Sequence, residues 1–339
     1  AMTGLNEKEH WSCDGDAYWW HLGLAWGLQL AALKVRREKD FKAWEIIRIA
    51  LEQGSYLRNG EELLSKYDPH GMAYKWLLAS NNPNDNFKIH HPLKSWLKQP
   101  MLLIGGWWDP HLKGIIDIYK QSISSGGSPE LYIGNATHLK WWNEVQSLHL
   151  SFFDKHLKGQ NLPLTNSKQI NLWNICTQKW EETESNTLNI WGLSSAGKAC
   201  FDIYEGKLNR NSKGKGWVKI VSDPWRPVPS RGGHLSQIPG IVERTDIDER
   251  LDVAVFSTPK FVESQYLEGT PVLEITTQSD CEGFDICVAL SKVSEDLRET
   301  IQLSTGFLRI KGEEALKGTK RRIPLQPICA EINPKELLR

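Results

Sequence analysis

The sequence has 339 residues, and its 41 lysines and arginines are balanced by 41 aspartates and glutamates, so the formal net charge is zero. This length fits two domains, or one large core with an inserted piece. The neutral balance gives no support for nucleic acid or an acidic membrane surface as a partner. The sequence contains no run of about 18 apolar residues, so it predicts no membrane-spanning helix.

The chain begins with four helical patterns. Apolar residues recur at helical spacing from about residue 16 to 34 and again from 41 to 51. Asn59 followed by Glu62 has the layout of a capping box, which predicts that a third helix starts there. A fourth helix is expected over residues 70–78 and is ended by the turn-forming run 81–86. The first 88 residues therefore predict an all-helical unit.

The pattern changes after Pro100. Residues 101–104 (Met-Leu-Leu-Ile) form a short apolar run before two glycines, as a buried parallel strand would. A helix over 112–124, a strand over 131–133, a helix over 143–157 and a strand over 170–176 follow. This alternation predicts an α/β sheet.

Helical periodicity ends after about residue 197. Strands are expected at 253–256, 272–277 and 284–290, separated by turns, and residues 207–216 are polar and Gly-rich, as in a loop or mobile linker. This part predicts a β-sandwich.

Two ionisable residues lie directly after the first two strands of the predicted α/β sheet. Asp109 follows the first strand and His138 the second. Functional groups in such sheets lie at the carboxyl ends of the strands, so the two can meet at one edge. Asp109 would then orient His138, which acts as a general base. Spacing alone equally permits the alternative that the Asp caps a helix and the His makes a local hydrogen bond.

Collinear segments add a family resemblance. They are residues 105–109 (Gly-Gly-Trp-Trp-Asp), 134–138 (Gly-Asn-Ala-Thr-His), 151–159 (Ser-Phe-Phe-Asp-Lys-His-Leu-Lys-Gly), 223–229 (Asp-Pro-Trp-Arg-Pro-Val-Pro), 249–253 (Glu-Arg-Leu-Asp-Val) and 267–272 (Leu-Glu-Gly-Thr-Pro-Val). Together they resemble the cocaine-esterase-like acyl esterases of the X-prolyl dipeptidyl-peptidase family of serine hydrolases. The resemblance implies that Asp109 and His138 are the Asp and His of a Ser-His-Asp triad.

The resemblance also implies a domain plan. It is a partial α/β-hydrolase fold at 1–8 and 89–197, with an inserted helical cap at 9–88 and a C-terminal β jelly-roll, which could be truncated, at 198–339. By the same resemblance Trp11 and Trp26 match cap positions that line the acyl pocket, although Trp26 also suits a plain core position. Trp108 and His111 are further expected substrate contacts, His111 at a position often held by an aromatic rim residue.

The nucleophile is expected to lie upstream of this chain, because the family order is Ser, Asp, His and the serine elbow precedes the cap. Gly192 to Gly197 resembles an elbow but follows His138, so we interpret it as a turn. Ser12 lacks the elbow glycines. We therefore expect this chain by itself to be inactive.

Substrates are expected to be small acyl esters, amides or short peptides. Amino-acid ester hydrolases have an acidic pair soon after the triad Asp, whereas Pro110, His111 and Leu112 follow here, which favours neutral acyl esters. The alternative is a non-catalytic binding protein whose jelly-roll engages sugars or a partner, and the upstream coding sequence would distinguish the two. The jelly-roll is expected to cover the site and to support a homo-oligomer.

No cofactor or metal is expected, because His90 and His91 are adjacent and no H-E-x-x-H or paired cysteine spacing occurs. The scattered cysteines and the absence of a signal-peptide layout favour reduced thiols and a cytoplasmic setting. The cysteines are Cys13, Cys176, Cys200, Cys281, Cys287 and Cys329.

Overall fold

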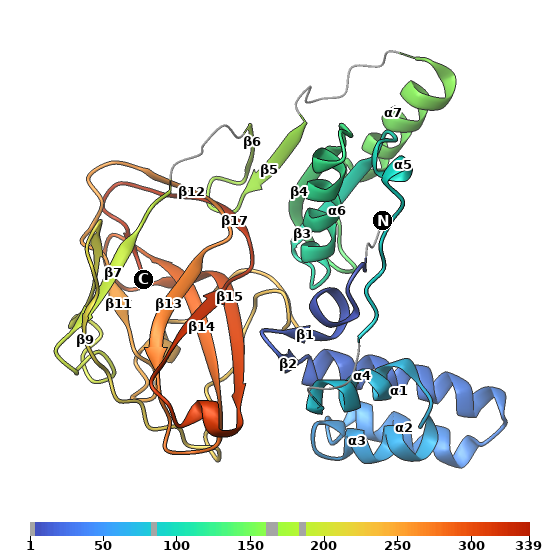
Figure 1. Ribbon diagram of the computed structural model, residues 1–339, viewed down its shortest axis with the longest axis horizontal. Helices are drawn as coiled ribbons and strands as arrows, with labels where there is room; N and C mark the ends of the chain where they lie inside the picture. The colour runs from blue at the N-terminus through green and yellow to red at the C-terminus, as the bar shows by residue number, and fades with distance from the viewer. Residues whose placement is uncertain (1–3, 83–86, 161–168, 183–187) are drawn as a thin grey trace.

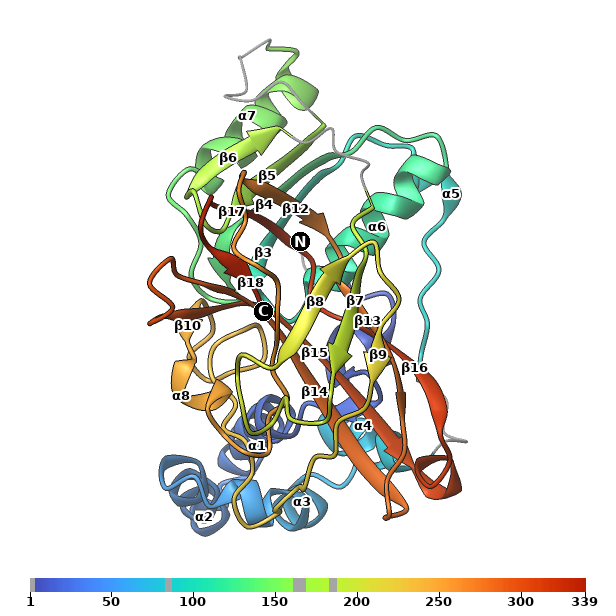
Figure 2. The same ribbon diagram turned by 90° about the vertical axis from the view of Figure 1, so that its left-hand side faces the viewer.

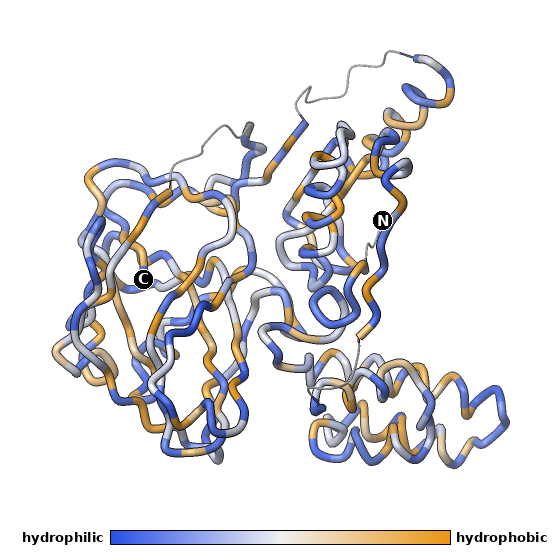
Figure 3. Tube along the Cα trace, viewed as in Figure 1, coloured by the Kyte–Doolittle hydropathy of each residue, from blue (hydrophilic) through white to orange (hydrophobic). Residues whose placement is uncertain are grey.

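The computed structural model describes residues 4–82, 87–160, 169–182 and 188–339. Three parts follow one another along the chain: a helical part, an α/β part and a β-rich domain (Figure 1). The β-rich domain lies beside the other two, and the view in Figure 2 shows its long strands β14 and β15 running toward the helical part. Hydrophobic segments occur in all three parts (Figure 3).

The helical part starts with a π-helical turn, η1 (Lys8–Ser12), and a hairpin of β1 (Cys13–Asp14) and β2 (Ala17–Tyr18). Four helices follow: α1 (Trp20–Arg37), α2 (Phe41–Glu52), α3 (Tyr56–Tyr67) and α4 (Met72–Asn81). They bury one apolar cluster that includes Leu24, Leu28, Ile47, Leu64 and Leu77. The four predicted helices are therefore present, each within a few residues of its expected bounds.

The predicted start of the third helix at Asn59 is wrong. Helix α3 begins at Tyr56, and the buried Oδ1 of Asn59 has no hydrogen-bond partner among the described residues, so no capping box forms. Tyr56 is only 3% exposed, and its hydroxyl is 2.6 Å from Nδ1 of His21. Burial of Tyr56 against α1 favours the extra turn over the local cap.

The α/β part contains α5 (Lys94–Leu97), β3 (Leu102–Trp108), α6 (Leu112–Ser124), β4 (Glu130–Thr137), α7 (Val145–Lys158), β5 (Ile170–Asn174) and β6 (Lys179–Glu182). The sheet order is β3-β4-β5-β6, with β3, β4 and β5 parallel and β6 antiparallel to β5. The predicted βαβα order is confirmed. Strand β3 is longer than predicted, because its pairing with β4 continues through both glycines.

Alternate residues of β3 and β4 face opposite sides of the sheet. Leu103 and Leu131 share a cluster with α6, which extends to β12, β15 and β17 of the β-rich domain. Ile104 and Tyr132 pack with Leu148 of α7 in a separate cluster. Both faces are thus covered, which explains the continuous apolar run in β3.

The β-rich domain holds the remaining elements. They are β7 (Trp191–Ser195), β8 (Gly206–Arg210), β9 (Lys215–Gly216), β10 (Val242–Glu243), α8 (Thr245–Asp248), β11 (Phe256–Ser257), β12 (Gln265–Gly269), β13 (Val272–Thr277), β14 (Gly283–Val293), β15 (Thr300–Lys311), η2 (Gly312–Ala315), β16 (Thr319–Pro324), β17 (Ile328–Ile332) and β18 (Leu337–Leu338). Two four-stranded sheets, β10-β15-β14-β18 and β11-β8-β7-β9, are accompanied by the pairs β12-β17 and β13-β16. The strand predicted at 272–277 is confirmed, and 284–290 lies within β14.

Four predictions for this region do not match the structure. Residues 207–216 are not simply a loop, because β8 and β9 lie there, and residues 192–195 are strand rather than turn. The expected strand 253–256 is reduced to the short β11. Strand β7 pairs with β8, so the part of the chain up to 197 that was assigned to the α/β unit already contributes to the β-rich domain from residue 191 onward.

All six cysteines are free; Cys13, Cys200 and Cys329 are buried, Cys176 is half-buried, and Cys281 and Cys287 are exposed. Among the described residues no helix is both long enough and apolar enough to cross a membrane.

Candidate active site

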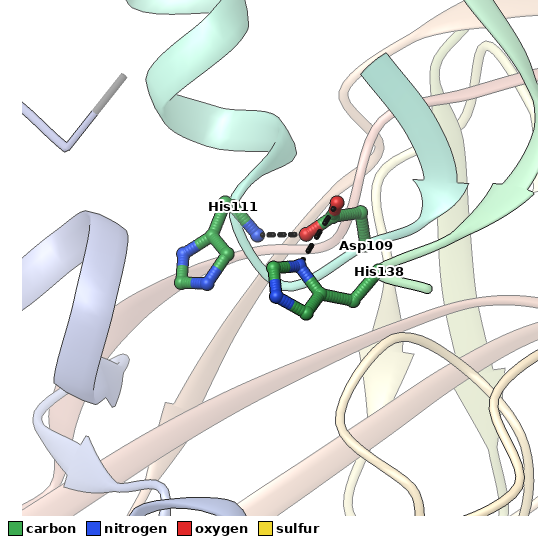
Figure 4. A group of neighbouring side chains, drawn as sticks. All are labelled: Asp109, His111 and His138. Atoms are coloured by element: carbon green, nitrogen blue, oxygen red, sulfur yellow. Dashed lines mark hydrogen bonds and ion pairs between the residues drawn. The ribbon is translucent and has the colours of Figure 1, made fainter. Parts of the chain in front are cut away.

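Asp109 and His138 meet at the carboxyl ends of β3 and β4. Nδ1 of His138 donates a hydrogen bond to Oδ2 of Asp109 at 3.4 Å (Figure 4). Asp109 is buried, whereas the His138 side chain is 41% exposed. The contact is long for a charge-assisted hydrogen bond. The arrangement is that of the acid and base of a triad, with the second imidazole nitrogen left to face a reacting group.

Gly106 allows the two strand ends to approach so closely. A Cβ at this position would lie 2.4 Å from the carbonyl oxygen of Ala136, so only glycine fits. The β3–β4 register shifts between Gly106 and Trp108, immediately before Asp109. Such an irregularity re-aims the following side chains, which brings Asp109 toward His138.

Two hydrogen bonds hold Asp109, one from a backbone N–H and one from a side-chain amide. The His111 N–H donates to its Oδ1 at 2.8 Å, within the turn that leads into α6. On the other side Gln326, between β16 and β17 of the β-rich domain, donates from Nε2 to the Asp109 carbonyl at 3.3 Å. The β-rich domain therefore contacts the loop that carries the acid.

The electrostatics suit an ion pair. Burial by itself would raise the pKa of Asp109, but the hydrogen bonds from His138 and the His111 backbone outweigh it and hold that pKa below its ordinary value. The hydrogen bond to Asp109 raises the pKa of His138, against a smaller opposing effect of burial. Asp109 thus stabilises the imidazolium that forms when His138 takes a proton.

His111 lies beside the pair. Its Nδ1 is 2.7 Å from the His10 carbonyl, and its ring centroid is 5.0 Å from that of His138. Burial lowers the pKa of His111, which favours a neutral ring at neutral pH. Asp109, His111 and His138 are the one group in the described part of the chain whose ligand atoms, within 4.8 Å of one another, could hold a metal ion.

A row of aromatic rings leads from His111 into the helical part. Trp11 is 4.7 Å from His111 and 6.1 Å from Trp76, and Trp76 stacks on Trp26 at 5.9 Å, all between ring centroids. The ring centroid of Trp19 also lies 5.8 Å from that of His111. The structure therefore brings Trp11 and His111 together beside His138 and joins Trp26 to them through Trp76.

Trp108 lies apart from this row. It is 4% exposed, belongs to the core between α6 and the β-rich domain, and donates from Nε1 to Oδ1 of Asn135 at 3.3 Å. Its expected contact with substrate stays a prediction, because the structure places the ring in this core.

A second polar cluster ties the three parts together. Asp14 of the β1–β2 hairpin pairs with Lys113 of α6, and Oδ2 of Asp14 is 3.1 Å from Nε2 of His234 in the β-rich domain. Asp14 and His234 are both buried. The hydrogen bond from His234 and the charge of Lys113 outweigh the effect of burial and lower the pKa of Asp14.

The serines singled out in the sequence are engaged elsewhere. The Ser12 hydroxyl is buried and donates to the Glu7 carbonyl at 2.8 Å. The Ser195 hydroxyl donates to Glu205 at 2.6 Å, and Ser194 lies in β7, which pairs with β8 and β9 on both sides. None of the three sits on a strand-to-helix turn, the geometry of a nucleophile elbow.

Two family models match this chain. The family model described as X-Pro dipeptidyl-peptidase (S15 family) matches residues 1–140. The model described as X-Pro dipeptidyl-peptidase C-terminal non-catalytic domain matches residues 158–334, more than half of the chain. The chain belongs to the CocE/NonD and X-Pro dipeptidyl-peptidase family.

Individual relatives of the family are distant. A cocaine esterase from Rhodococcus sp. (strain MB1 Bresler) is 24% identical over 245 residues, which are 65% of this chain and 42% of that protein. A CocE/NonD family hydrolase from Staphylococcus aureus superposes with a TM-score of 0.54 at 15% identity, covering 84% of this chain and 54% of its own. An α-amino acid ester hydrolase gives a TM-score of 0.57 at 16% identity, covering 71% and 47%.

The chain thus spans about half the length of the CocE/NonD relatives it matches. The structural matches show the family fold, an α/β-hydrolase unit with a C-terminal β domain. They leave the jelly-roll topology as a prediction.

Four site neighbours were not predicted from the sequence: His10, Trp19, Trp76 and Gln326. Each reaches the site through tertiary contacts rather than through a motif. The sixteen tryptophans were a general signal for an aromatic pocket. Nothing in the spacing distinguishes Trp19 and Trp76 from tryptophans of the core.

Proposed function

We propose that this chain carries the acid and the general base of a serine hydrolase that cleaves acyl esters or amides. The observation that carries the proposal is the hydrogen bond between the buried Asp109 and the partly exposed His138 at adjacent parallel strand ends. Family membership supports the same chemistry, because a relative is a cocaine esterase.

The nucleophilic serine is proposed to lie outside this sequence. Nε2 of His138 accepts no hydrogen bond from a serine among the described residues, and Ser12 and Ser195 are bonded elsewhere. A serine hydroxyl against Nε2 would transfer its proton to His138 as its oxygen attacks the substrate carbonyl. His138 would then protonate the leaving alcohol or amine, and a water molecule would repeat the cycle to release the acid.

The aromatic row supports an apolar acyl group as substrate. Trp11, Trp26 and His111 line one connected path of rings beside His138, which is the setting in which an uncharged acyl chain gains most from leaving water. Enzymes that bind a substrate ammonium need a spare carboxylate. Asp14, the buried carboxylate near Lys113, is already paired with Lys113 and His234. The aromatic row thus favours neutral acyl esters over amino-acid esters and dipeptides.

The test compares hydrolysis of p-nitrophenyl acetate and butyrate by this chain and by a form extended upstream through the coding sequence. Activity is expected only in the extended form and is expected to disappear in His138→Ala. His149→Ala is the matched control, because His149 lies on α7 and bonds only the Val145 carbonyl in the described part of the chain. Activity of the short chain that depends on His138 would show that the nucleophile lies within it. An extended form that neither hydrolyses esters nor reacts with a fluorophosphonate would overturn the proposal.

A further inference from the structure

The two histidines beside Asp109 have an arrangement that catalysis by His138 does not require. Their ring centroids are 5.0 Å apart, with the planes at 67°. Figure 4 shows the rings next to each other, with Nδ1 of His138 turned toward the Asp109 carboxylate. A Ser-His-Asp triad uses only one imidazole, so the triad does not account for the position of the His111 ring.

Hydrogen-bond partners fix the tautomers of both rings. A carbonyl oxygen can only accept, so Nδ1 of His111 must carry the proton that it donates to the His10 carbonyl. The Asp109 carboxylate likewise requires a proton on Nδ1 of His138. In the neutral rings both Nε2 atoms are therefore unprotonated, and each presents a lone pair.

The His10 carbonyl, which accepts the hydrogen bond from His111, is itself held in place. Nδ1 of His10 accepts from the backbone N–H groups of Leu5 and Asn6 at 3.2 Å each, and its Nε2 donates to Asp117 of α6 at 2.9 Å. The His10 side chain is only 4% exposed. The His10 carbonyl is thus a fixed acceptor that orients the His111 ring.

We propose that His111 and His138 form a binding site for a divalent transition-metal ion of the Zn²⁺ or Cu²⁺ type, with their Nε2 atoms as ligands. Imidazole nitrogen is a preferred ligand for these ions. Metal-bound histidines typically donate their other ring N–H to a carboxylate or a backbone carbonyl. Both second contacts are present here: Asp109 behind His138 and the His10 carbonyl behind His111.

The three side chains are already close together. One ligand atom from each of Asp109, His111 and His138 lies within 4.8 Å of the others. Two nitrogens at about 2.0 Å from a tetrahedral ion are roughly 3.3 Å apart. His138 exposes 41% of its side chain and can rotate, whereas His111 is held by His10. Water, or an oxygen of a substrate or product, completes the coordination.

Metal binding at this site has a direct consequence for the proposed hydrolase. The ion occupies the lone pair of His138 with which it would accept the serine proton, so metal-bound protein cannot use His138 as a base. The site would act as a reversible metal inhibition site. Binding itself does not depend on the proposed hydrolysis, so either inference can fail without the other.

The experiment is titration of this chain with ZnCl₂ and CuCl₂ by isothermal calorimetry at neutral pH, in the absence of any ester. One binding event per chain is expected, and it is expected to be lost in His111→Phe and in His138→Phe. His149→Phe is the matched control, because Nδ1 of His149 also bonds a carbonyl, at 2.8 Å, but His149 belongs to no group of ligands in the described structure. Binding that survives His111→Phe, or that is absent from the wild type, would overturn the proposal.

A second measurement uses only the wild-type protein, so its result does not depend on whether the variants fold. Diethyl pyrocarbonate modifies unprotonated histidine nitrogens, and peptide mass spectrometry identifies the modified residues. Zn²⁺ is expected to protect His111 and His138 while His149 is modified at an unchanged rate. Equal modification of all three residues with and without Zn²⁺ would contradict the proposed ligands.

Discussion

Replacing Gly106 with alanine tests whether close strand approach creates the Asp109–His138 contact. The new Cβ would lie 2.4 Å from the Ala136 carbonyl oxygen and 2.8 Å from the Ala136 Cβ. These are atoms of β4 that cannot rotate away. Strands β3 and β4 would have to separate by roughly 1 Å to restore an ordinary contact. Overpacking of this kind costs about 2 kcal/mol of unfolding free energy.

The same separation reaches the site, because Asp109 follows Gly106 by three residues and His138 follows Ala136 by two. The 3.4 Å contact between Asp109 and His138 lengthens, so the pKa of His138 is expected to fall toward its ordinary value. Urea denaturation followed by tryptophan fluorescence measures the stability. An NMR titration of the imidazole signals measures the pKa.

The matched control is Gly283→Ala in β14, where the nearest atom to a new Cβ is the Ile310 carbonyl oxygen at an ordinary 3.5 Å. This variant should unfold at nearly the wild-type urea concentration and leave the His138 titration unchanged. If Gly106→Ala matches the wild type in both measurements, the close strand approach does not set the geometry of the pair.

Three further substitutions test the site and its supports. Asp109→Asn should lower the pKa of His138. A histidine pKa that folding raises stabilises the protein at pH values below the unfolded-state pKa of about 6.5, and this stabilisation is lost above the folded-state pKa. The variant should therefore lose more unfolding free energy at about pH 5.5 than at about pH 8, and equal losses at the two pH values would contradict the coupling. Lys113→Met leaves buried Asp14 without its cation and should lower the unfolding free energy by about 2 to 3 kcal/mol, whereas Lys317→Met at an exposed pair should change it little. Trp76→Ala should cost about 3 kcal/mol in urea denaturation, and a loss below about 1 kcal/mol would show that the aromatic row is loosely packed.

The helices and the α/β strands were predictable because they depend on local patterns. Helix α6 has the predicted bounds, and β3 and β4 lie where short apolar runs precede glycine. Strands β7 and β8 were not predicted, because their sequences contain glycine and several polar residues. Pairing between the two strands, rather than the β-propensity of their residues, makes them strands.

The meeting of Asp109 and His138 could likewise be predicted from the sequence, because adjacent parallel strands place both residues at one edge of the sheet. What surrounds the pair was decided only by folding. His10, Trp76 and Gln326 come from three separate parts of the chain, and each reaches the site through a packing or hydrogen-bond contact at long sequence separation. Local sequence determines strands and turns. Contacts at long sequence separation depend on how whole helices and strands pack together, and the spacing of residues along the chain does not predict that packing.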